Sequence, residues 1–276
     1  MQGYIKGVIL LLALMSLPFG VSAREYSFAI VPQYTVTKVY TSWKPVLAEL
    51  QRSTGHNFKL LVYPSFREFE TDYLNGVPDF VYFNPYHQVV GYKAQGYIPL
   101  VRDGERKLTG IIVVRKDSGI DSIAQLQGKE IAFPAPNAFA ASLYMRALLQ
   151  EKEGLKFNAR YVLSHSNSYR HVYSGQAMAA GGVMSTLNTQ PALIRDTLKV
   201  IYQTPDYPPH PIAAHPRVPV EDRKAVTDTL LAMRYSSNGL RQLAGIQMTY
   251  PMLADYQHDY AQLGRLGLER YYQPYE

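Results

Sequence analysis

The chain has 276 residues, with 28 Lys and Arg against 22 Asp and Glu, 23 tyrosines and no cysteine. The absence of cysteine excludes disulfide scaffolds, thiolate zinc sites, iron–sulfur clusters and cysteine nucleophiles. The formal charge of +6 is modest and the basic residues are scattered, whereas a nucleic-acid-binding protein concentrates them on one face, so we expect no nucleic-acid partner.

Residues 1–23 have the three parts of a cleaved secretory signal. Lys6 supplies a positive start, residues 7–15 are apolar, and the small residues up to Ala23 suit a cleavage site. An uncleaved membrane anchor is the alternative, but the apolar run is shorter than the roughly 20 residues that span a bilayer. Because no cysteine follows this run, lipid attachment there is excluded as well. We expect an exported, periplasmic protein that begins at Arg24 and is not anchored in the membrane.

Strand-like and helix-like segments alternate along the rest of the chain. Apolar runs predict strands at residues 26–31, 58–63, 79–83, 110–115, 130–133, 160–163, 178–183, 198–203 and 212–214. Apolar spacing and capping residues predict helices at residues 43–50, 66–74, 85–94, 138–151, 168–174, 185–193, 219–234 and 251–263. Ser65 followed by Glu68 is a capping-box pattern. Asn84 before Pro85 marks another helix start, and Asn137 is the predicted N-cap of the helix at 138–151.

This order of elements predicts an α/β fold in which a mainly parallel sheet is covered by helices on both faces. The length that follows the signal suits two such lobes better than one. The strands at 110–115 and 198–204 are the best candidates for crossing between the lobes. We therefore expect a hinged, two-lobed fold with a first lobe from residues 24–110, an inserted second lobe from 111–200, and a return to the first lobe over 201–276.

The strand-to-helix junctions are candidate ligand sites. In such sheets ligands bind beyond the carboxyl ends of the strands, where helix N-termini offer free N–H groups to anions. The junction at residues 133–142 has two prolines and small side chains that let a ligand approach the backbone. Alternatively, its alanines are only good helix formers packed on the sheet. Ser65 and Asn84 begin two similar junctions with aromatic neighbours, and each of these alone is also compatible with a capped core helix.

Histidines follow two of the predicted strands on the expected ligand side. His165 lies in a polar loop and His210 lies between prolines, so both are suitable hydrogen-bond donors to an oxyanion. His210 and His215 have a spacing seen in metal pairs, but prolines prevent a helix there and no third ligand is near, so we expect no metal site. The sequence has no G-x-S-x-G, HExxH, P-loop or dinucleotide-binding motif, so we expect neither catalytic residues nor a cofactor.

Several short segments together point to a known family. They are FAIV at 28–31, WKP at 43–45, YPSF at 63–66, DFVYFNP at 79–85, GY at 96–97, VRKDS at 114–118, LQGK at 126–129, the helix start at 137–142, His165, and VIYQTP at 200–205. In these segments the chain resembles the periplasmic phosphate, phosphite and phosphonate-binding proteins of ABC transporters, in particular the phosphonate-binding type. The resemblance covers nearly the whole mature chain and implies a type II, two-lobed binding protein that closes on its ligand.

The resemblance also indicates how this site differs from those of its relatives. Where phosphonate-binding relatives have a Ser-Thr-Ser run, this chain has Ala138, Phe139 and Ala140, so only backbone N–H groups remain. The two carboxylates that meet an amino group in some relatives match Ser185 and His210, which argues against an aminophosphonate. Arsenite-sensing relatives depend on a cysteine that this chain lacks. The other candidate binding residues are the family's histidine, the positions matching its pocket tyrosines, and their neighbours: His165, Phe66, Phe83, Tyr34, Tyr82, Asn84, Asn137 and Ser142.

The function that this resemblance implies is solute capture for transport. We expect a periplasmic protein that binds a small phosphate-, phosphite- or phosphonate-like oxyanion between its lobes and delivers it to the permease of an ABC transporter. One alternative is a ligand-sensing protein of the same fold that partners a two-component histidine kinase. Another is a hydrolase or metal-dependent enzyme. We expect a monomeric binder without enzymatic activity.

Overall fold

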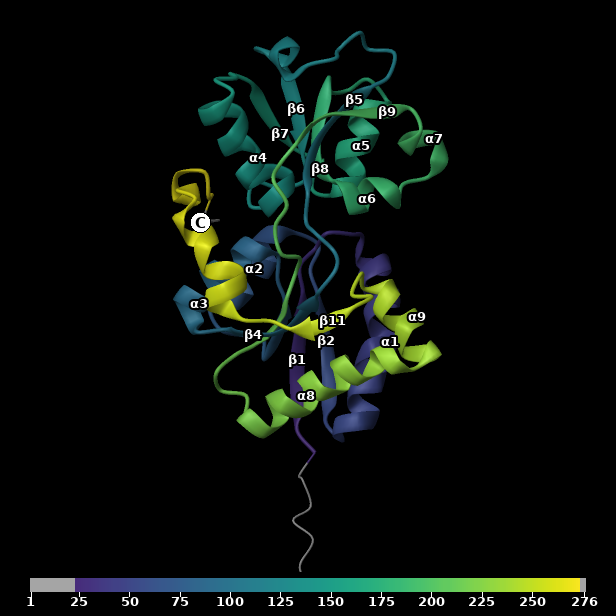
Figure 1. Cartoon of the computed structure of the whole chain (residues 1–276), viewed down its shortest axis with the longest axis vertical. Coiled ribbons are helices and arrows are strands. Elements are labelled where there is room, and N and C mark those ends of the chain that lie inside the picture. The colour runs from purple at the N-terminus through teal and green to yellow at the C-terminus, as the bar shows by residue number, and fades with distance from the viewer. Residues whose placement is uncertain (1–22, 274–276) are drawn as a thin grey trace, which may run out of the picture.

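Two β-sheets organise the computed structural model, which describes residues 23–273 (Figure 1). In spatial order, the sheet of the first lobe contains β11 (Pro251–Leu253), β4 (Ile98–Asp103), β10 (Ile212–Ala214), β3 (Phe80–Tyr82), β1 (Glu25–Ile30) and β2 (Asn57–Val62). The sheet of the second lobe contains β7 (Asn158–Tyr161), β6 (Glu130–Phe133), β8 (Ala179–Val183), β5 (Gly110–Arg115) and β9 (Leu198–Gln203). Apart from Ala23, the predicted signal lies outside the described residues.

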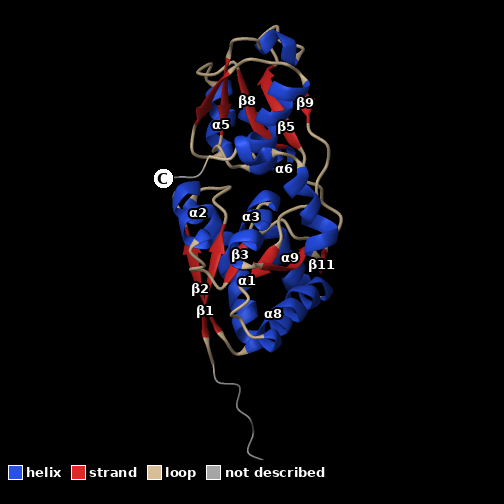
Figure 2. Cartoon of the chain, turned by 90° about the vertical axis from the view of Figure 1, so that its left-hand side faces the viewer, coloured by secondary structure: helices blue, strands red, loops and turns tan. Residues whose placement is uncertain are grey.

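Helices surround both sheets, as Figure 2 shows from the side. Those of the first lobe are α1 (Val36–Thr54), α2 (Phe66–Leu74), α3 (Pro85–Gln95), α8 (Val220–Ala232) and α9 (Ser237–Gly245). Those of the second lobe are α5 (His165–Tyr173), α6 (Met184–Asn188), α7 (Ala192–Arg195) and a continuous helix made of η2 (Phe139–Leu143), α4 (Tyr144–Ala147) and η3 (Leu148–Lys152). Among the described residues, none of the helices combines the length and hydropathy that a membrane span needs.

The strand pairing confirms a two-lobed α/β fold, but the sheets are mixed rather than mainly parallel. In the first lobe β1 runs parallel to β2 and β3, whereas β10 is antiparallel to both β3 and β4, and β11 is antiparallel to β4. In the second lobe β6 runs parallel to β7 and β8, whereas β5 is antiparallel to β8 and β9. Two of the antiparallel strands, β5 and β10, each follow directly from a strand of the other lobe. Because no crossover helix precedes them, nothing forces them into a parallel orientation.

Two helix starts with local capping signals are placed where the sequence predicts them. Ser65 caps α2 by accepting a hydrogen bond from Glu68 N, and Asn84 caps α3 through His87 N with Pro85 in the first turn. By contrast, the predicted helix at residues 251–263 is wrong at its start, because 251–253 form the edge strand β11. An edge strand tolerates a proline, which lacks the N–H of a ladder bond. Strand β4 and helix α9 have no counterpart among the predicted elements.

Two chain segments join the lobes, residues 104–109 between β4 and β5 and residues 204–211 between β9 and β10 (Figure 1). They are paired with each other through a short antiparallel bridge. Leu108 N donates to Tyr207 O at 2.9 Å, and Tyr207 N donates back to Leu108 O at 3.2 Å. The lobes are therefore connected by two chain segments that lie side by side, an arrangement that suits a hinge.

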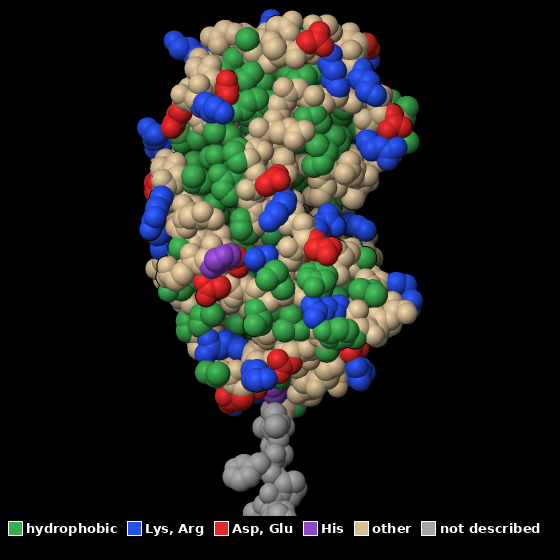
Figure 3. Space-filling view, in the orientation of Figure 1, with side chains coloured by type: hydrophobic (Ala, Val, Ile, Leu, Met, Phe, Trp, Pro, Cys, Tyr) green, Lys and Arg blue, Asp and Glu red, His purple; other side chains and the backbone are tan. Residues whose placement is uncertain are grey.

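Charged side chains of both signs are interspersed over the face of the molecule that Figure 3 shows. Lys and Arg lie beside Asp and Glu on both lobes of this face, with apolar side chains between them. This face therefore presents no concentrated basic patch of the kind that binds a nucleic-acid backbone.

Candidate functional site

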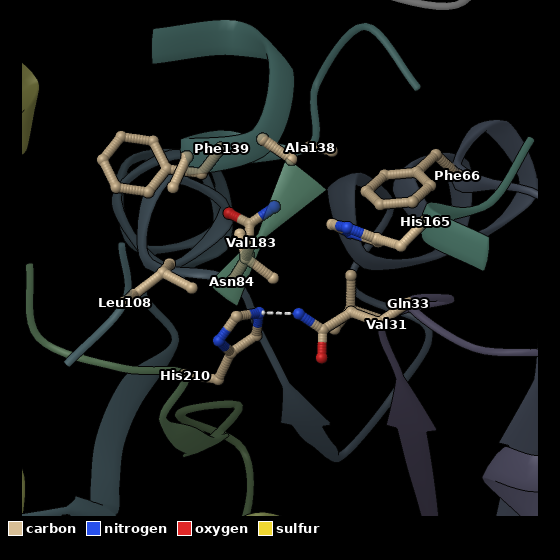
Figure 4. A pocket seen from close by; sticks show the side chains of 12 residues that line it. Val31, Gln33, Phe66, Asn84, Leu108, Ala138, Phe139, His165, Val183 and His210 are labelled. Carbon is tan, nitrogen blue, oxygen red and sulfur yellow. Dashed lines mark hydrogen bonds between the residues drawn. The ribbon is translucent and has the colours of Figure 1, made fainter. Parts of the chain in front are cut away.

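A small cavity lies between the lobes beside the crossover segments (Figure 4). The space between its lining atoms amounts to about 250 Å³ and is partly open to solvent. Residues of both lobes and both crossovers line it: Val31, Gln33, Phe66, Asn84, Leu108, Ala138, Phe139, Ala140, Ala141, His165, Val183 and His210. Seven of the residues singled out in the sequence meet here, namely Phe66, Asn84, Ala138, Phe139, Ala140, His165 and His210. Among the described residues that line it, none is Lys, Arg, Asp or Glu.

The backbone that follows β6 supplies one wall of this cavity. Ala138 is the N-cap of the helix and has no side-chain capping bond. The first hydrogen bonds to Ala138 O come from Ser142 N at 2.8 Å and Leu143 N at 3.0 Å. The N–H groups of residues 139–141 precede these bonds and therefore have no acceptor within the helix. Free N–H groups at a helix start bind anions. The prediction that Asn137 caps this helix is wrong, because its side chain bonds to the first lobe and to Gln273 instead.

Two glycines let this helix start lie directly against the second sheet. A Cβ on Gly110 of β5 would come within 2.1 Å of Ala140 O, and a Cβ on Gly181 of β8 within 2.3 Å of Ala141 O. No other residue would fit without moving the helix start. The Gly-Gly pair at 181–182 thus has a packing role, and Gly182 leaves room for the hydroxyl of Tyr169.

His165 approaches the cavity from the second lobe, in the first turn of α5. It is 2% exposed, and its Nδ1 lies 3.5 Å from Thr186 Oγ1. The Thr186 hydroxyl also contacts the hydroxyl of Tyr169 at 2.9 Å, which holds this side of the cavity in place. Burial lowers the pKa of His165 to about 4, so the imidazole is neutral at pH 7.

His210 lies in the second crossover and faces Gln33, the position three residues after β1 (Figure 4). Its Nε2 is 2.6 Å from the Nε2 of Gln33, and its ring stacks on Tyr82 at 5.3 Å between centroids. Burial lowers the pKa of His210 to about 3, with further lowering by His165, His87 and Arg106. Both histidines therefore act as neutral hydrogen-bonding groups at pH 7.

Asn84 connects the two lobes at the edge of the cavity. Its Oδ1 accepts from His87 N at 2.8 Å as the cap of α3, and its Nδ2 donates to Asn137 O at 3.2 Å. The side chain is 3% exposed. One residue thus fixes a helix start in the first lobe and the backbone just before the second-lobe helix.

The other predicted site residues lie outside this cavity. Tyr34 and Tyr82 line a neighbouring cavity with Trp43, and the two cavities share Val31 and Gln33. The remaining four are placed as follows: Phe83 packs against Phe69, Tyr73 and Tyr97; Asn137 bonds to Glu70 and Gln273; Ser142 accepts from Arg146 Nε; Ser185 is partly exposed on α6.

Sequence reasoning missed part of the lining, namely Val31, Gln33, Leu108 and Val183. Gln33 carried a usable signal, because it follows the first strand of the chain at the carboxyl end where ligands bind. Leu108 had none, since its position depends on the path of the crossover. Over residues 23–273, no group of three His, Cys, Asp or Glu side chains could hold a metal ion.

Comparison with known proteins identifies the family. A family model described as "ABC transporter, phosphonate, periplasmic substrate-binding protein" matches residues 28–260, well over half of the chain. A binding protein component of an ABC phosphonate transporter from Pseudomonas aeruginosa is similar in structure with a TM-score of 0.80 and 17% identity, over 90% of this chain and 88% of that one. PhnD1 from Prochlorococcus marinus, solved in complex with methylphosphonate, gives a TM-score of 0.81 and 15% identity, over 88% and 97%.

A Xanthomonas citri protein bound to a chloride ion is a further structural neighbour, with a TM-score of 0.74 and 17% identity over 90% of this chain and 98% of that one. At these identities the neighbours establish the fold alone. The family match adds the class of protein, which is a substrate-binding component of a transporter rather than an enzyme. The chain belongs to the family of periplasmic substrate-binding proteins of phosphonate ABC transporters.

Proposed function

We propose that this protein captures a small oxyanion, of the phosphate, phosphite or phosphonate type, in the cavity between its lobes and delivers it to the permease of an ABC transporter. In this proposal residues 1–23 are a signal that is removed after Ala23. The single observation that carries the ligand class is the composition of the cavity wall. The N–H groups at the start of the second-lobe helix lie beside the neutral polar side chains of Gln33, Asn84, His165 and His210.

The chemistry of this wall suits a buried anion. Because N–H groups at a helix start carry partial positive charge, they stabilise an anion without a cationic side chain. No carboxylate lines the cavity among the described residues, so nothing there repels an anion or pairs with an amino group. The apolar side chains of Val31, Leu108 and Val183 offer a surface against which a small apolar substituent can pack. These features support a small phosphonate without an amino group. The comparisons do not favour the kinase-sensing alternative.

A thermal-shift panel tests this proposal. Phosphate, phosphite, methylphosphonate and sulfate are each added to the purified protein, because a ligand that binds only the folded state raises the melting temperature. We expect at least one phosphorus oxyanion to raise it in a concentration-dependent way. No response to any of the four anions would refute the oxyanion proposal.

Two variants, each with one alanine replaced by leucine, show where on the protein the anion binds. Ala138→Leu places three extra carbon atoms in the cavity wall and is expected to abolish the shift. Ala124→Leu makes the same change at an exposed position of the second lobe and should retain it. An equal response from both variants would place the anion elsewhere on the protein.

A further inference from the structure

The C-terminal part of the described chain belongs to the first lobe but extends to the second (Figure 1). It contains the short helix η7 (Leu268–Arg270) and residues 271–273. Leu268 is fully buried in the core cluster of the first lobe, and the Tyr272 ring lies 6.2 Å from that of Tyr86 on α3. The end of the segment lies at the level of the junction between the lobes in both views (Figure 2). We refer to residues 268–273 as the C-terminal strap.

The strap bonds to the second lobe through side chains of the helix that begins at the cavity. Arg146 Nη2 donates to Tyr271 O at 2.8 Å, and Arg270 pairs with Glu151 at 2.8 Å. Arg146 is 6% exposed and also donates to Pro136 O at 2.9 Å. The same guanidinium group therefore bonds to the strap and to the loop that leads into the helix start.

Asn137 makes the second connection, and it is specific for backbone. Its Oδ1 accepts from Gln273 N at 3.0 Å while its Nδ2 donates to Gln273 O at 2.8 Å, as a neighbouring strand would. The same Nδ2 donates to Glu70 Oε2 of the first lobe at 2.8 Å. Asn137 immediately precedes Ala138, so this contact fixes the backbone on which the cavity wall depends.

Glu70 is the buried acceptor at the centre of this arrangement. It is 1% exposed and, besides Asn137, accepts from Tyr272 Oη at 2.8 Å and lies 3.0 Å from His87 Nε2. A buried carboxylate needs several such donors to offset its loss of water. Opening the lobes would remove the Asn137 donor from Glu70 while leaving Tyr272 and His87 in place, because both belong to the first lobe.

We propose that the C-terminal strap and Glu70 hold the second lobe closed through Asn137, and that Asn137 is thereby a positioning residue for the anion-binding N–H groups of residues 139–141. This inference rests on the proposed function. Strap and ligand both stabilise the closed arrangement, so loss of the strap lowers the closed fraction. Apparent affinity falls in proportion to that fraction.

Two variants and one control test the role of the strap. Asn137→Ala removes the side chain that links Glu70 to Gln273. A chain ending at Tyr271 removes the last strap residues but keeps Leu268 in the core, so one of the two variants remains informative if the other folds poorly. Asn158→Ala is the control, because Asn158 is exposed on β7 of the same lobe and its side chain makes no hydrogen bond to the described residues.

The first readout is calorimetric affinity for the anion that gives the largest thermal shift among phosphate, phosphite, methylphosphonate and sulfate. We expect Asn137→Ala and the shortened chain to bind about tenfold more weakly, as when their closed fraction is about one tenth of that of the parent protein. Asn158→Ala should bind like the parent protein. Unchanged affinity in both strap variants would overturn the proposal.

The second readout is the distance between the lobes, which a purely structural role of Asn137 would not change. Because the chain has no cysteine, Lys59→Cys and Lys156→Cys allow specific spin labelling of exposed positions by the outer strands β2 and β7. Without ligand, the strap variants should show longer distances than the parent, and added anion should restore the short one.

Identical distances in all variants would refute the strap even if the parent binds an anion. Longer distances in the strap variants, together with a parent protein that binds none of the four anions, would support the strap and contradict the proposed function alone.

Discussion

At the scale of single residues, the histidines of the cavity determine how the protein responds to acid. Burial lowers the pKa of His165 to about 4 and that of His210 to about 3, whereas both titrate near 6.5 in an unfolded chain. Between these values the unfolded state binds more protons than the folded state. The stability that these two histidines contribute therefore rises with pH in this range and is fully present above about pH 6.5. It is lost as the pH falls toward their pKa values in the folded state.

We expect the free energy of unfolding to fall by about 1.4 kcal/mol per pH unit for each of these two histidines as the pH falls below about 6.5. His165→Asn should remove one of the two contributions and flatten the dependence. Urea unfolding at a series of pH values from about 7 to about 4.5 measures this slope. Asn158→Ala, at an exposed side chain that does not titrate, is the control and should leave the slope unchanged. An unaltered slope in His165→Asn would contradict the buried, neutral state of that imidazole.

Residue roles were predictable where the partner is close in the sequence. Ser65 and Asn84 bond to N–H groups three residues away, so sequence spacing alone identifies them as caps. Asn137 has the same residue type and the same position after a strand, yet its partners Glu70 and Gln273 lie 67 and 136 residues away. A capping residue and a residue that joins two lobes cannot be distinguished without knowing what the fold brings beside them.

At the scale of elements, the site depends on how closely the helix start approaches the second sheet. Strands β5 and β8 were predictable from their apolar runs, and each contributes a glycine that faces a backbone carbonyl of this helix. The π-helical turns at both ends of the helix were not predictable, since they depend on this close packing rather than on local preference. The edge strand β11 was missed for a related reason, because it exists only through its pairing with β4.

Gly110→Ala should displace the helix start, because the new Cβ would lie 2.1 Å from Ala140 O and 2.9 Å from Thr204 Cγ2. Overpacking of this kind costs about 1–3 kcal/mol of stability, and here it also moves the N–H groups of the cavity wall. We expect a lower melting temperature together with loss of the anion-induced shift. Gly245→Ala is the matched control, since its Cβ would meet only Ser42 O at 3.9 Å. A Gly110→Ala protein that keeps the full shift would show that the cavity wall does not depend on this contact.

At the scale of the whole molecule, the lobes share an apolar interface as well as polar contacts. The Phe139 ring of the second lobe stacks on the Tyr86 ring of the first, with 6.1 Å between centroids and 8° between planes. The Tyr207 ring of the crossover packs edge to face against Phe139, with 5.3 Å between centroids. All three belong to or pack against the core cluster that extends from the first lobe into the helix start. The order of strands and helices predicted two lobes, but it could not predict this closed interface, because the aromatic residues come from distant segments.

Closure should be visible in solution as a change in the size of the whole protein. The two crossovers are paired only through Leu108 and Tyr207 and a few neighbouring contacts, so the lobes can separate without breaking either sheet. In the absence of ligand, opening is opposed by the Phe139 interface and the C-terminal strap and favoured by hydration of the polar cavity wall. Bound anion replaces that water and shifts the population toward the closed arrangement.

We expect small-angle X-ray scattering to give a smaller radius of gyration with the anion that raises the melting temperature than without it. An anion that gives no thermal shift should leave the radius unchanged. Equal radii with and without the stabilising anion would mean that the ligand enters a protein that is already closed, and the hinge between residues 104–109 and 204–211 would then have no part in binding.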